Sequence, residues 1–219
     1  MYDTILFDLD GTLTDPGLGI TNSVAYALAK FGIPVEDRTS LYPFIGPPLK
    51  DSFHEFFSFS DEDCVRAIAW YREYFAEKGL LENEVYDGTV QMLTALKSAG
   101  KRLIVATSKP DEFSRRILTH FGLDGYFDFV AGATMDEKRT SKADVIAYAI
   151  EVGDIDPATA VMVGDRKHDI LGAKANGLDS IGVLYGYGSR EEMEEAGATT
   201  IAATTEEVVA WVMGRRVDS

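Results

Sequence analysis

The segment TILFDLDGT, residues 4–12, indicates the fold of this chain, because a short apolar run ends there in two acids and a glycine. Such a run is typical of a buried strand that leads into a loop. Similar runs follow at residues 102–108, 128–133, 160–165 and 180–186. Helical patterns separate them, at residues 89–99, 111–121, 141–152 and 168–175. Strands that alternate with helices indicate parallel βαβ units. We therefore expect an α/β fold with a doubly wound, Rossmann-like and mostly parallel sheet, closed by apolar stretches near 200–203 and 206–213.

A long helical segment interrupts this alternation. It shows helical periodicity at 20–31, 49–57 and 62–78, and it contains no run with the pattern of a core strand. We therefore predict an α/β core domain of residues 1–15 and 84–219, with residues 16–83 inserted as a helical domain after the loop of the first strand. Within the core, three glycines follow predicted helices where a left-handed cap is expected: Gly100, Gly122 and Gly153.

The charge of the chain limits its partners. Lys and Arg number 21 against 36 Asp and Glu, a formal net charge of −15. A surface this acidic repels nucleic acids and anionic membranes, so we expect neither as a partner. A small phosphorylated metabolite would be repelled as well, unless a metal ion or a locally positive pocket receives it. The sequence leaves the oligomeric state open between monomer and homodimer.

Cysteine usage and hydropathy point to a cytoplasmic protein. The single cysteine, Cys64, excludes an intrachain disulfide, and its setting is that of a small apolar helix residue. No segment has the run of about 18 apolar residues that a membrane span needs. Asp3, Asp8 and Asp10 interrupt the apolar stretch that a signal peptide would require.

The motif DLDGT at residues 8–12 places two carboxylates, Asp8 and Asp10, at the end of the first predicted strand. If the chain turns there, both carboxylates can reach one site, one as a nucleophile and the other as a general acid and base. Gly11 supplies the freedom for the turn, and Thr12 can orient its neighbours by hydrogen bonds. An ordinary capped turn is the alternative, since Asp and Gly are common turn residues.

Further polar residues recur at the predicted strand ends and helix starts: Thr107, Ser108, Lys142, Asp165 and Asp169. A parallel sheet brings the carboxyl ends of its strands to one edge, so we expect these residues to converge with Asp8. Each also has a simpler interpretation. Asp169 and the Thr107-Ser108 pair could cap helices, and Lys142 could be a solvated surface residue.

These motifs, taken in order, resemble those of the haloacid dehalogenase-like hydrolase superfamily, in the branch of phosphoglycolate phosphatases and 5′-nucleotidase-like enzymes. The resemblance covers DLDGT at 8–12, Thr107-Ser108, Lys142 and GDRKHD at 164–169. The helical insert lies where that branch places its cap domain.

The resemblance implies a Mg²⁺-dependent phosphatase that hydrolyses a small phosphate monoester through an aspartyl-phosphate intermediate. Asp8 would be the nucleophile, and Asp10 would be the general acid and base. Mg²⁺ would be held by Asp8, the backbone carbonyl of Asp10 and Asp165, while Asp169 would orient its water ligands. The phosphate would be bound by Thr107, Ser108, Lys142, Gly11 and Thr12.

Several residues are candidates for substrate selection. The loop Gly46-Pro47-Pro48-Leu49 resembles a substrate-facing cap loop, although a rigid loop without a ligand would have the same composition. Arg72 could face the phosphate or lie along its helix. Lys109 and Arg139 are neighbours of predicted site residues and could add positive potential. Four phenylalanines at 53, 56, 57 and 59 are expected to pack the core of the insert, with stacking on a nucleobase as the alternative.

Other reactions on the same fold stay open to different degrees. A dehalogenase would lack the second acid of DLDGT, so Asp10 argues against it. A sugar phosphomutase of the β-phosphoglucomutase type would share every motif. A non-catalytic binding domain would be expected to have lost some of the acids at 8, 10, 165 and 169.

Overall fold

The computed structural model describes residues 2–136 and 138–214, and the chain divides into two compact units. One unit consists of Met1–Thr14 and Val85–Ser219, and the other of Asp15–Glu84. The predicted bounds of the core and the insert differ from these by one residue, and their assignment as a core domain and a cap domain stays a prediction. Two short strands, β2 (Thr14–Asp15) and β3 (Glu84–Val85), pair where the chain passes between the units.

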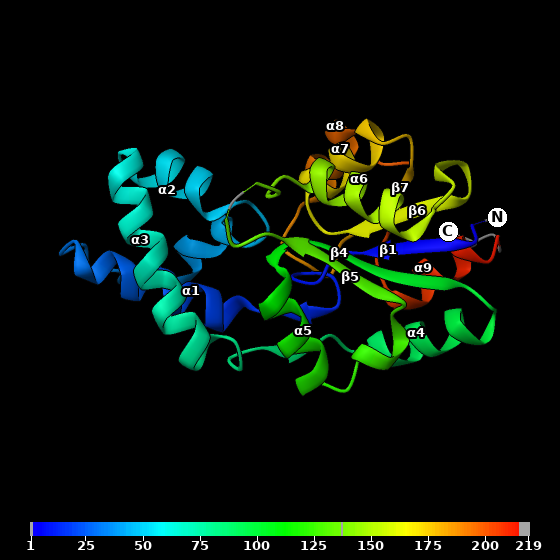
Figure 1. Ribbon diagram of the computed structural model, residues 1–219, viewed down its shortest axis with the longest axis horizontal. Helices are drawn as coiled ribbons and strands as arrows, with labels where there is room; N and C mark the ends of the chain where they lie inside the picture. Colours follow the sequence, from blue (N-terminus) through cyan, green and yellow to red (C-terminus); the bar gives the residue numbers. More distant parts are fainter. Residues whose placement is uncertain (1, 137, 215–219) are drawn as a thin grey trace. The chain divides into compact units, whose positions relative to one another are not determined.

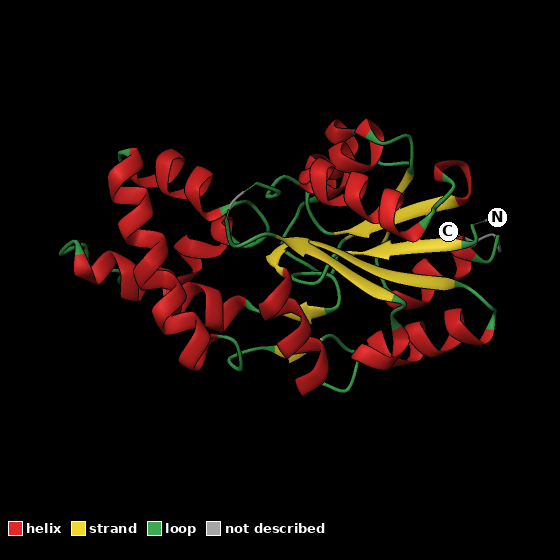
Figure 2. Ribbon diagram, in the orientation of Figure 1, coloured by secondary structure: helices red, strands yellow, loops and turns green. Residues whose placement is uncertain are grey.

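The first unit is built on a six-stranded sheet with the order β5-β4-β1-β6-β7-β8. The strands are β1 (Thr4–Phe7), β4 (Arg102–Pro110), β5 (Phe129–Ala133), β6 (Ala160–Gly164), β7 (Asp179–Val183) and β8 (Thr200–Ala202). All neighbours are parallel (Figures 1 and 2). The expected α/β fold is thereby confirmed, and β1 lies in the middle of the sheet, where its four residues are all buried.

Helices cover both faces of this sheet, which explains why its strands are apolar throughout. Helices α6 (Lys142–Gly153) and α7 (Lys167–Ala175) pack on one face, with α8 (Arg190–Ala196) against α7 (Figure 1). Helices α4 (Thr89–Ser98), α5 (Asp111–His120) and α9 (Thr205–Val212) lie on the other. Leu6, Ile104 and Met162 of three neighbouring strands pack with residues of α6 in a fully buried cluster.

The second unit is helical and has an aromatic core. It contains α1 (Gly17–Lys30), α2 (Leu49–Phe57), α3 (Asp61–Tyr74), a 3-10 helix at Arg38–Phe44 and a π-helix at Phe75–Gly79. Phe53 is fully buried. Its ring is stacked on that of Phe59 with centroids 5.7 Å apart, and it meets Phe44 edge-on at 5.0 Å. Phe56 is 44% exposed. Phe53 therefore serves packing within the unit.

Local details differ from the sequence-based expectations at several points. Gly100 and Gly122 have φ of 74° and 66°, as expected of left-handed caps. The prediction for Gly153 is wrong, because Gly153 ends α6 and Asp154 takes the left-handed position with φ of 47°. A Cβ on Gly153 would lie 3.0 Å from the Phe129 ring, so the glycine permits close packing instead.

The remaining differences concern element boundaries. The predicted helix 62–78 divides into α3 and the π-helix, and the predicted strand 180–186 ends at Val183. Helix α8 was not expected. Among residues 2–136 and 138–214, no helix combines the length and apolarity that crossing a membrane requires.

Candidate active site

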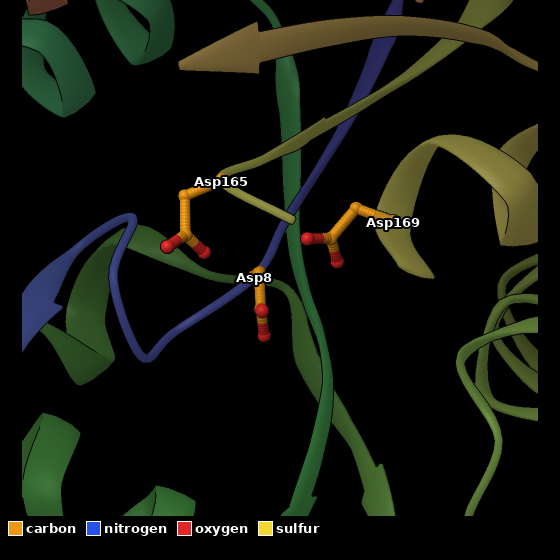
Figure 3. Close-up of side chains that lie close together, drawn as sticks. All are labelled: Asp8, Asp165 and Asp169. Atoms are coloured by element: carbon orange, nitrogen blue, oxygen red, sulfur yellow. The ribbon is translucent and has the colours of Figure 1, made fainter. Parts of the chain in front are cut away.

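Three carboxylates from separate segments come together in the α/β unit (Figure 3). Asp8 follows β1, Asp165 follows β6, and Asp169 lies in the first turn of α7. Strands β1 and β6 are parallel neighbours with Phe7 opposite Val163, so their carboxyl ends meet at one edge of the sheet. One oxygen from each carboxylate lies within 4.8 Å of the others, and all three side chains are buried. The predicted convergence of these acids is therefore present.

Lys142 is the cation of this cluster. It is the first residue of α6, and Ser141 caps the helix by accepting a hydrogen bond from the backbone N–H of Asp144. The Lys142 Nζ lies 2.8 Å from Asp8 Oδ1 and 2.8 Å from Asp169 Oδ1. It also donates a hydrogen bond to the Ala106 carbonyl at 3.2 Å. Burial alone would lower the pKa of Lys142, but the carboxylates of Asp169 and Asp8 raise it above its ordinary value.

The charges of this cluster do not balance. Three carboxylates against one ammonium leave two negative charges if all four groups are ionised. Burial raises the pKa of Asp165 well above its ordinary value, and the carboxylates of Asp169 and Asp8 add to the effect. Burial also raises the pKa of Asp169 to about 6, although Lys142 opposes the shift. A buried anionic cluster of this kind is stabilised by a bound cation or by protonation.

The donor set fits a hard divalent cation. All the candidate ligand atoms are carboxylate oxygens, the type that Mg²⁺ and Ca²⁺ prefer. Asp165 Oδ1 is buried and has no hydrogen-bond partner among residues 2–136 and 138–214. Its other oxygen, Oδ2, accepts a hydrogen bond from the backbone N–H of Tyr187 at 2.8 Å. A buried carboxylate oxygen without a donor is expected where a cation binds.

Asp10 forms a second buried ion pair beside the cluster. Its Oδ2 lies 2.7 Å from the Nζ of Lys109, and both side chains are buried. Burial raises the pKa of Asp10, while the ammonium of Lys109 opposes this shift. Gly11 follows with φ of 80°, a conformation that favours glycine. The turn predicted after the first strand is therefore present, and Lys109 contacts Asp10 within the α/β unit.

The predicted hydroxyl groups lie near the end of β4. Thr107 is buried, and its Oγ1 accepts a hydrogen bond from the backbone N–H of Lys109 at 3.2 Å. Ser108 is half-buried. Helix α5 begins after Pro110 without a side-chain cap, so neither hydroxyl serves as the helix cap that the simpler interpretation suggested. Thr12 is buried, and its hydroxyl has no partner in the described part of the chain.

Asp169 has two roles at once. Its Oδ2 accepts a hydrogen bond from the backbone N–H of Arg166 at 3.1 Å, which closes the start of α7. Its Oδ1 pairs with Lys142. The capping interpretation and the site interpretation are therefore compatible, because the two oxygens of one carboxylate serve different partners.

The candidates for substrate selection lie in different places. Arg139 donates from Nε to the Gly132 carbonyl at 3.0 Å, and its guanidinium lies 3.6 Å from the centre of the Tyr148 ring. These contacts connect Arg139 to β5, which contains Gly132, and to α6, which contains Tyr148. Gly46, Pro47, Leu49 and Arg72 belong to the helical unit, where Pro48 precedes the first turn of α2.

Sequence reasoning missed the loop that follows β7. This loop supplies the Tyr187 N–H to Asp165, and its glycines 186 and 188 lie against Asp165 and Gly11. The run Gly186-Tyr187-Gly188 directly after an apolar strand is the signal that could have identified it, because glycine after a strand often marks close backbone approach.

The chain is similar in sequence and structure to several known proteins. A family model of haloacid dehalogenase-like hydrolases matches residues 5–183. A 5′-nucleotidase from Pseudomonas aeruginosa is 46% identical over 192 residues, which cover 88% of this chain and 87% of the relative. The tyrosine-protein kinase PtkA of Mycobacterium tuberculosis is 40% identical over 206 residues, or 93% of this chain and 70% of the kinase. The crystal structure of a predicted phosphatase from Clostridium acetobutylicum superimposes with a TM-score of 0.96 at 50% identity, covering 98% of this chain and 99% of that one.

Proposed function

The chain belongs to the haloacid dehalogenase-like hydrolase family and is a phosphoric monoester hydrolase, and we propose that it works through Asp8 as nucleophile with Mg²⁺ as cofactor. The observation that carries this proposal is the buried cluster in which Asp165, Asp169 and Lys142 surround Asp8.

Asp8 attacks the phosphorus atom of the substrate. Its Oδ1 accepts a hydrogen bond from the Leu9 N–H at 2.8 Å and pairs with Lys142, so we expect Oδ2 to be the attacking oxygen. The bond from Oδ2 to phosphorus forms as the bond from phosphorus to the leaving oxygen breaks. This splits one difficult displacement into two steps through an aspartyl-phosphate on Asp8.

Asp10 carries the proton. It protonates the leaving oxygen in the first step, and in the second it takes a proton from the water that hydrolyses the aspartyl-phosphate. Burial raises the pKa of Asp10, which favours a carboxyl group that can hold a proton, while the ammonium of Lys109 limits the shift. The buried pair with Lys109 also keeps the Asp10 side chain in one orientation.

The residues that would hold Mg²⁺ are Asp8, the backbone carbonyl of Asp10 and Asp165, with Asp169 orienting water ligands. When bound, the cation would neutralise charge on the phosphoryl group and on the attacking carboxylate. One divalent cation would balance the two excess negative charges of the cluster. Lys142, Thr107 and Ser108 would bind the phosphoryl oxygens together with the backbone of Gly11 and Thr12.

We propose that the substrate is a small phosphorylated metabolite in the cytoplasm. A net charge of −15 supports neither nucleic acid nor an anionic membrane as a partner. The 46% identity to a 5′-nucleotidase makes nucleoside 5′-monophosphates the first compounds to test, with phosphoglycolate and sugar phosphates next. Selection among them by Gly46, Pro47, Leu49, Arg72, Lys109 or Arg139 stays a prediction.

A second candidate follows from the kinase-named relative at 40% identity. The aspartyl-phosphate could be passed to a hydroxyl group of a second molecule instead of to water, as a phosphotransferase or phosphomutase would do. A non-catalytic role is not proposed, because Asp8, Asp10, Asp165 and Asp169 are all present and buried.

The test is release of inorganic phosphate from a panel of monoesters, with Mg²⁺ and with a chelator. Asp8→Asn keeps the side-chain shape but removes the nucleophile, so we expect turnover to fall by at least about 10³-fold with the fold unchanged by circular dichroism. Chelation should abolish activity of the unmodified chain. Near-normal turnover by Asp8→Asn would refute the mechanism. Transfer of labelled phosphate to an added hydroxyl compound, without phosphate release, would favour the second candidate.

A further inference from the structure

The loop of residues 184–188 holds Asp165 from one side. It follows β7, which is the parallel neighbour of β6, with Gly182 opposite Gly164. The loop therefore begins next to the carboxyl end of β6, where Asp165 is the first residue after the strand. There the backbone N–H of Tyr187 donates to Asp165 Oδ2 at 2.8 Å. The backbone of the loop thus binds a predicted metal ligand directly.

Two glycines allow the loop to come this close. A Cβ on Gly186 would lie 2.2 Å from the Gly11 carbonyl oxygen and 2.4 Å from the Asp165 Cβ. A Cβ on Gly188 would lie 1.9 Å from the Asp165 carbonyl oxygen. Neither glycine has positive φ. Alanine could adopt the same backbone angles, so glycine is needed at both positions because there is no space for a Cβ.

The turn after β1 also confines Asp165. A Cβ on Gly11 would lie 2.2 Å from Asp165 Oδ2. The carboxylate is therefore in close contact with both the turn after β1 and the loop after β7. In this arrangement Oδ2 is occupied by the Tyr187 N–H, while Oδ1 is buried and has no hydrogen-bond partner within the described ranges. The same carboxylate contributes one oxygen to the cluster with Asp8 and Asp169.

Tyr185 fastens the loop to the rest of the unit. Its ring meets that of Tyr86 edge-on, with centroids 5.4 Å apart and planes at 62°. Such a ring pair contributes about 0.5–1.5 kcal/mol beyond the area that it buries. The loop is therefore anchored at Tyr185, immediately before the glycine that touches Asp165.

We propose that the loop of residues 184–188 is a positioning element for the metal site. It fixes the rotamer of Asp165 by occupying Oδ2 and leaves Oδ1 as the oxygen for the cation. This inference rests on the proposed function, because it assumes that the acidic cluster binds Mg²⁺. Mg²⁺ demands nearly ideal octahedral geometry, whereas Ca²⁺ tolerates flexible geometry. A displaced Asp165 should therefore weaken Mg²⁺ binding more than Ca²⁺ binding.

The experiment is calorimetric titration of the full chain with MgCl₂ and, separately, with CaCl₂, in the absence of substrate. In Gly186→Ala the added methyl group displaces Asp165 or the loop, and we expect Mg²⁺ affinity to fall by about 10–100-fold, the usual effect of changing a residue that orients a metal ligand. The loss for Ca²⁺ should be smaller. Gly125→Ala is the matched control, because Gly125 is exposed, lacks positive φ and has open space where the methyl group would go.

The outcomes separate the inference from the proposed function. A wild-type chain that binds no Mg²⁺ overturns the proposed metal site and this inference with it. Wild-type binding together with a folded Gly186→Ala chain of nearly unchanged Mg²⁺ affinity overturns the inference alone. If Gly186→Ala does not fold, Tyr185→Ala decides the matter, because it releases the loop without adding atoms beside Asp165. We then expect about a tenfold loss of Mg²⁺ affinity, and unchanged affinity would overturn the inference.

Discussion

Replacement of Lys142 by methionine tests the electrostatics of the site most directly. The Lys142 ammonium bridges Asp8 and Asp169 at 2.8 Å each, and all three side chains are almost completely buried. Methionine fills nearly the same volume but removes the charge. Removal of one partner from a buried ion pair costs about 3–5 kcal/mol, because the remaining charge stays buried without compensation. Two carboxylates lose their partner here, so we expect the upper part of this range at pH 8 without metal.

The cost should depend on pH in a defined direction. The pKa of Asp169 is raised to about 6 by burial, even though Lys142 opposes the shift. A carboxyl group with a raised pKa in the folded state favours folding when it is protonated. That contribution is present below the ordinary pKa of 3.8 and is lost as pH rises through about 6. Without Lys142 the pKa of Asp169 rises further, so Asp169 is protonated and neutral at pH 5. A neutral carboxyl group needs no compensating cation, so the loss of Lys142 costs less stability at pH 5 than at pH 8.

Urea unfolding of both chains in chelator, at pH 8 and at pH 5, measures this difference. We expect Lys142→Met to lose about 4–5 kcal/mol at pH 8 and clearly less at pH 5. Mg²⁺ at pH 8 should restore part of the loss by supplying positive charge to the same carboxylates. Lys101→Met is the control, because Lys101 is buried too but its ammonium meets the backbone carbonyl of Tyr2 and the exposed carboxylate of Asp3, which keeps its hydration when the lysine is removed. A loss below about 1 kcal/mol at pH 8, or an equal loss at both pH values, would refute the reasoning.

Three further changes test other parts of the molecule. Lys109→Met removes the ammonium 2.7 Å from Asp10 Oδ2, so the pKa of Asp10 should rise and the pH profile of kcat should move to higher pH. Lys109→Arg should keep the profile in place, and a lower kcat with an unmoved profile would indicate a purely structural role. Leu49→Ala should change the preference between nucleoside 5′-monophosphates and phosphoglycolate by about tenfold or more, as measured by kcat/KM, whereas equal losses on every substrate would argue against selection by this loop. Phe53→Ala should destabilise the helical unit by about 3–5 kcal/mol, as measured by urea unfolding. Phe56 is 44% exposed, so Phe56→Ala should cost less than about 1 kcal/mol, and similar costs for both would contradict the assignment of Phe53 to the core.

The polar residues at the strand ends could be identified from the sequence because each follows a local pattern. Asp8 and Asp10 end an apolar run, and Asp165 ends another. Parallel strands present their carboxyl ends at one edge, so the alternation of strands and helices places Asp8 and Asp165 at the same edge of the sheet. The residue types then suggest oxygen-ligand chemistry. Local periodicity and general topology are sufficient for this part of the site.

The partners of these acids could not be predicted in the same way. Lys109 follows the predicted hydroxyl pair and was a candidate for substrate selection, yet its ammonium contacts Asp10. Gly153 stands where a left-handed cap is common, yet it packs against the Phe129 ring. Each of these outcomes depends on distances between segments that are remote in the chain. Such distances are set by strand order and register.

The sequence by itself determined the alternation of strands and helices, the acids at the strand ends and the family to which the chain belongs. Only the tertiary structure decided that Lys142 bridges Asp8 and Asp169, and that the loop after β7 holds Asp165. The physical reason is that periodicity reports which face of an element is buried, while hydrogen bonds and ion pairs require atoms of different segments to lie within about 3 Å. The order β1-β6-β7 in the sheet brings Asp8, Asp165 and the loop after β7 together, and the packing of α6 against α7 places Lys142 beside Asp169.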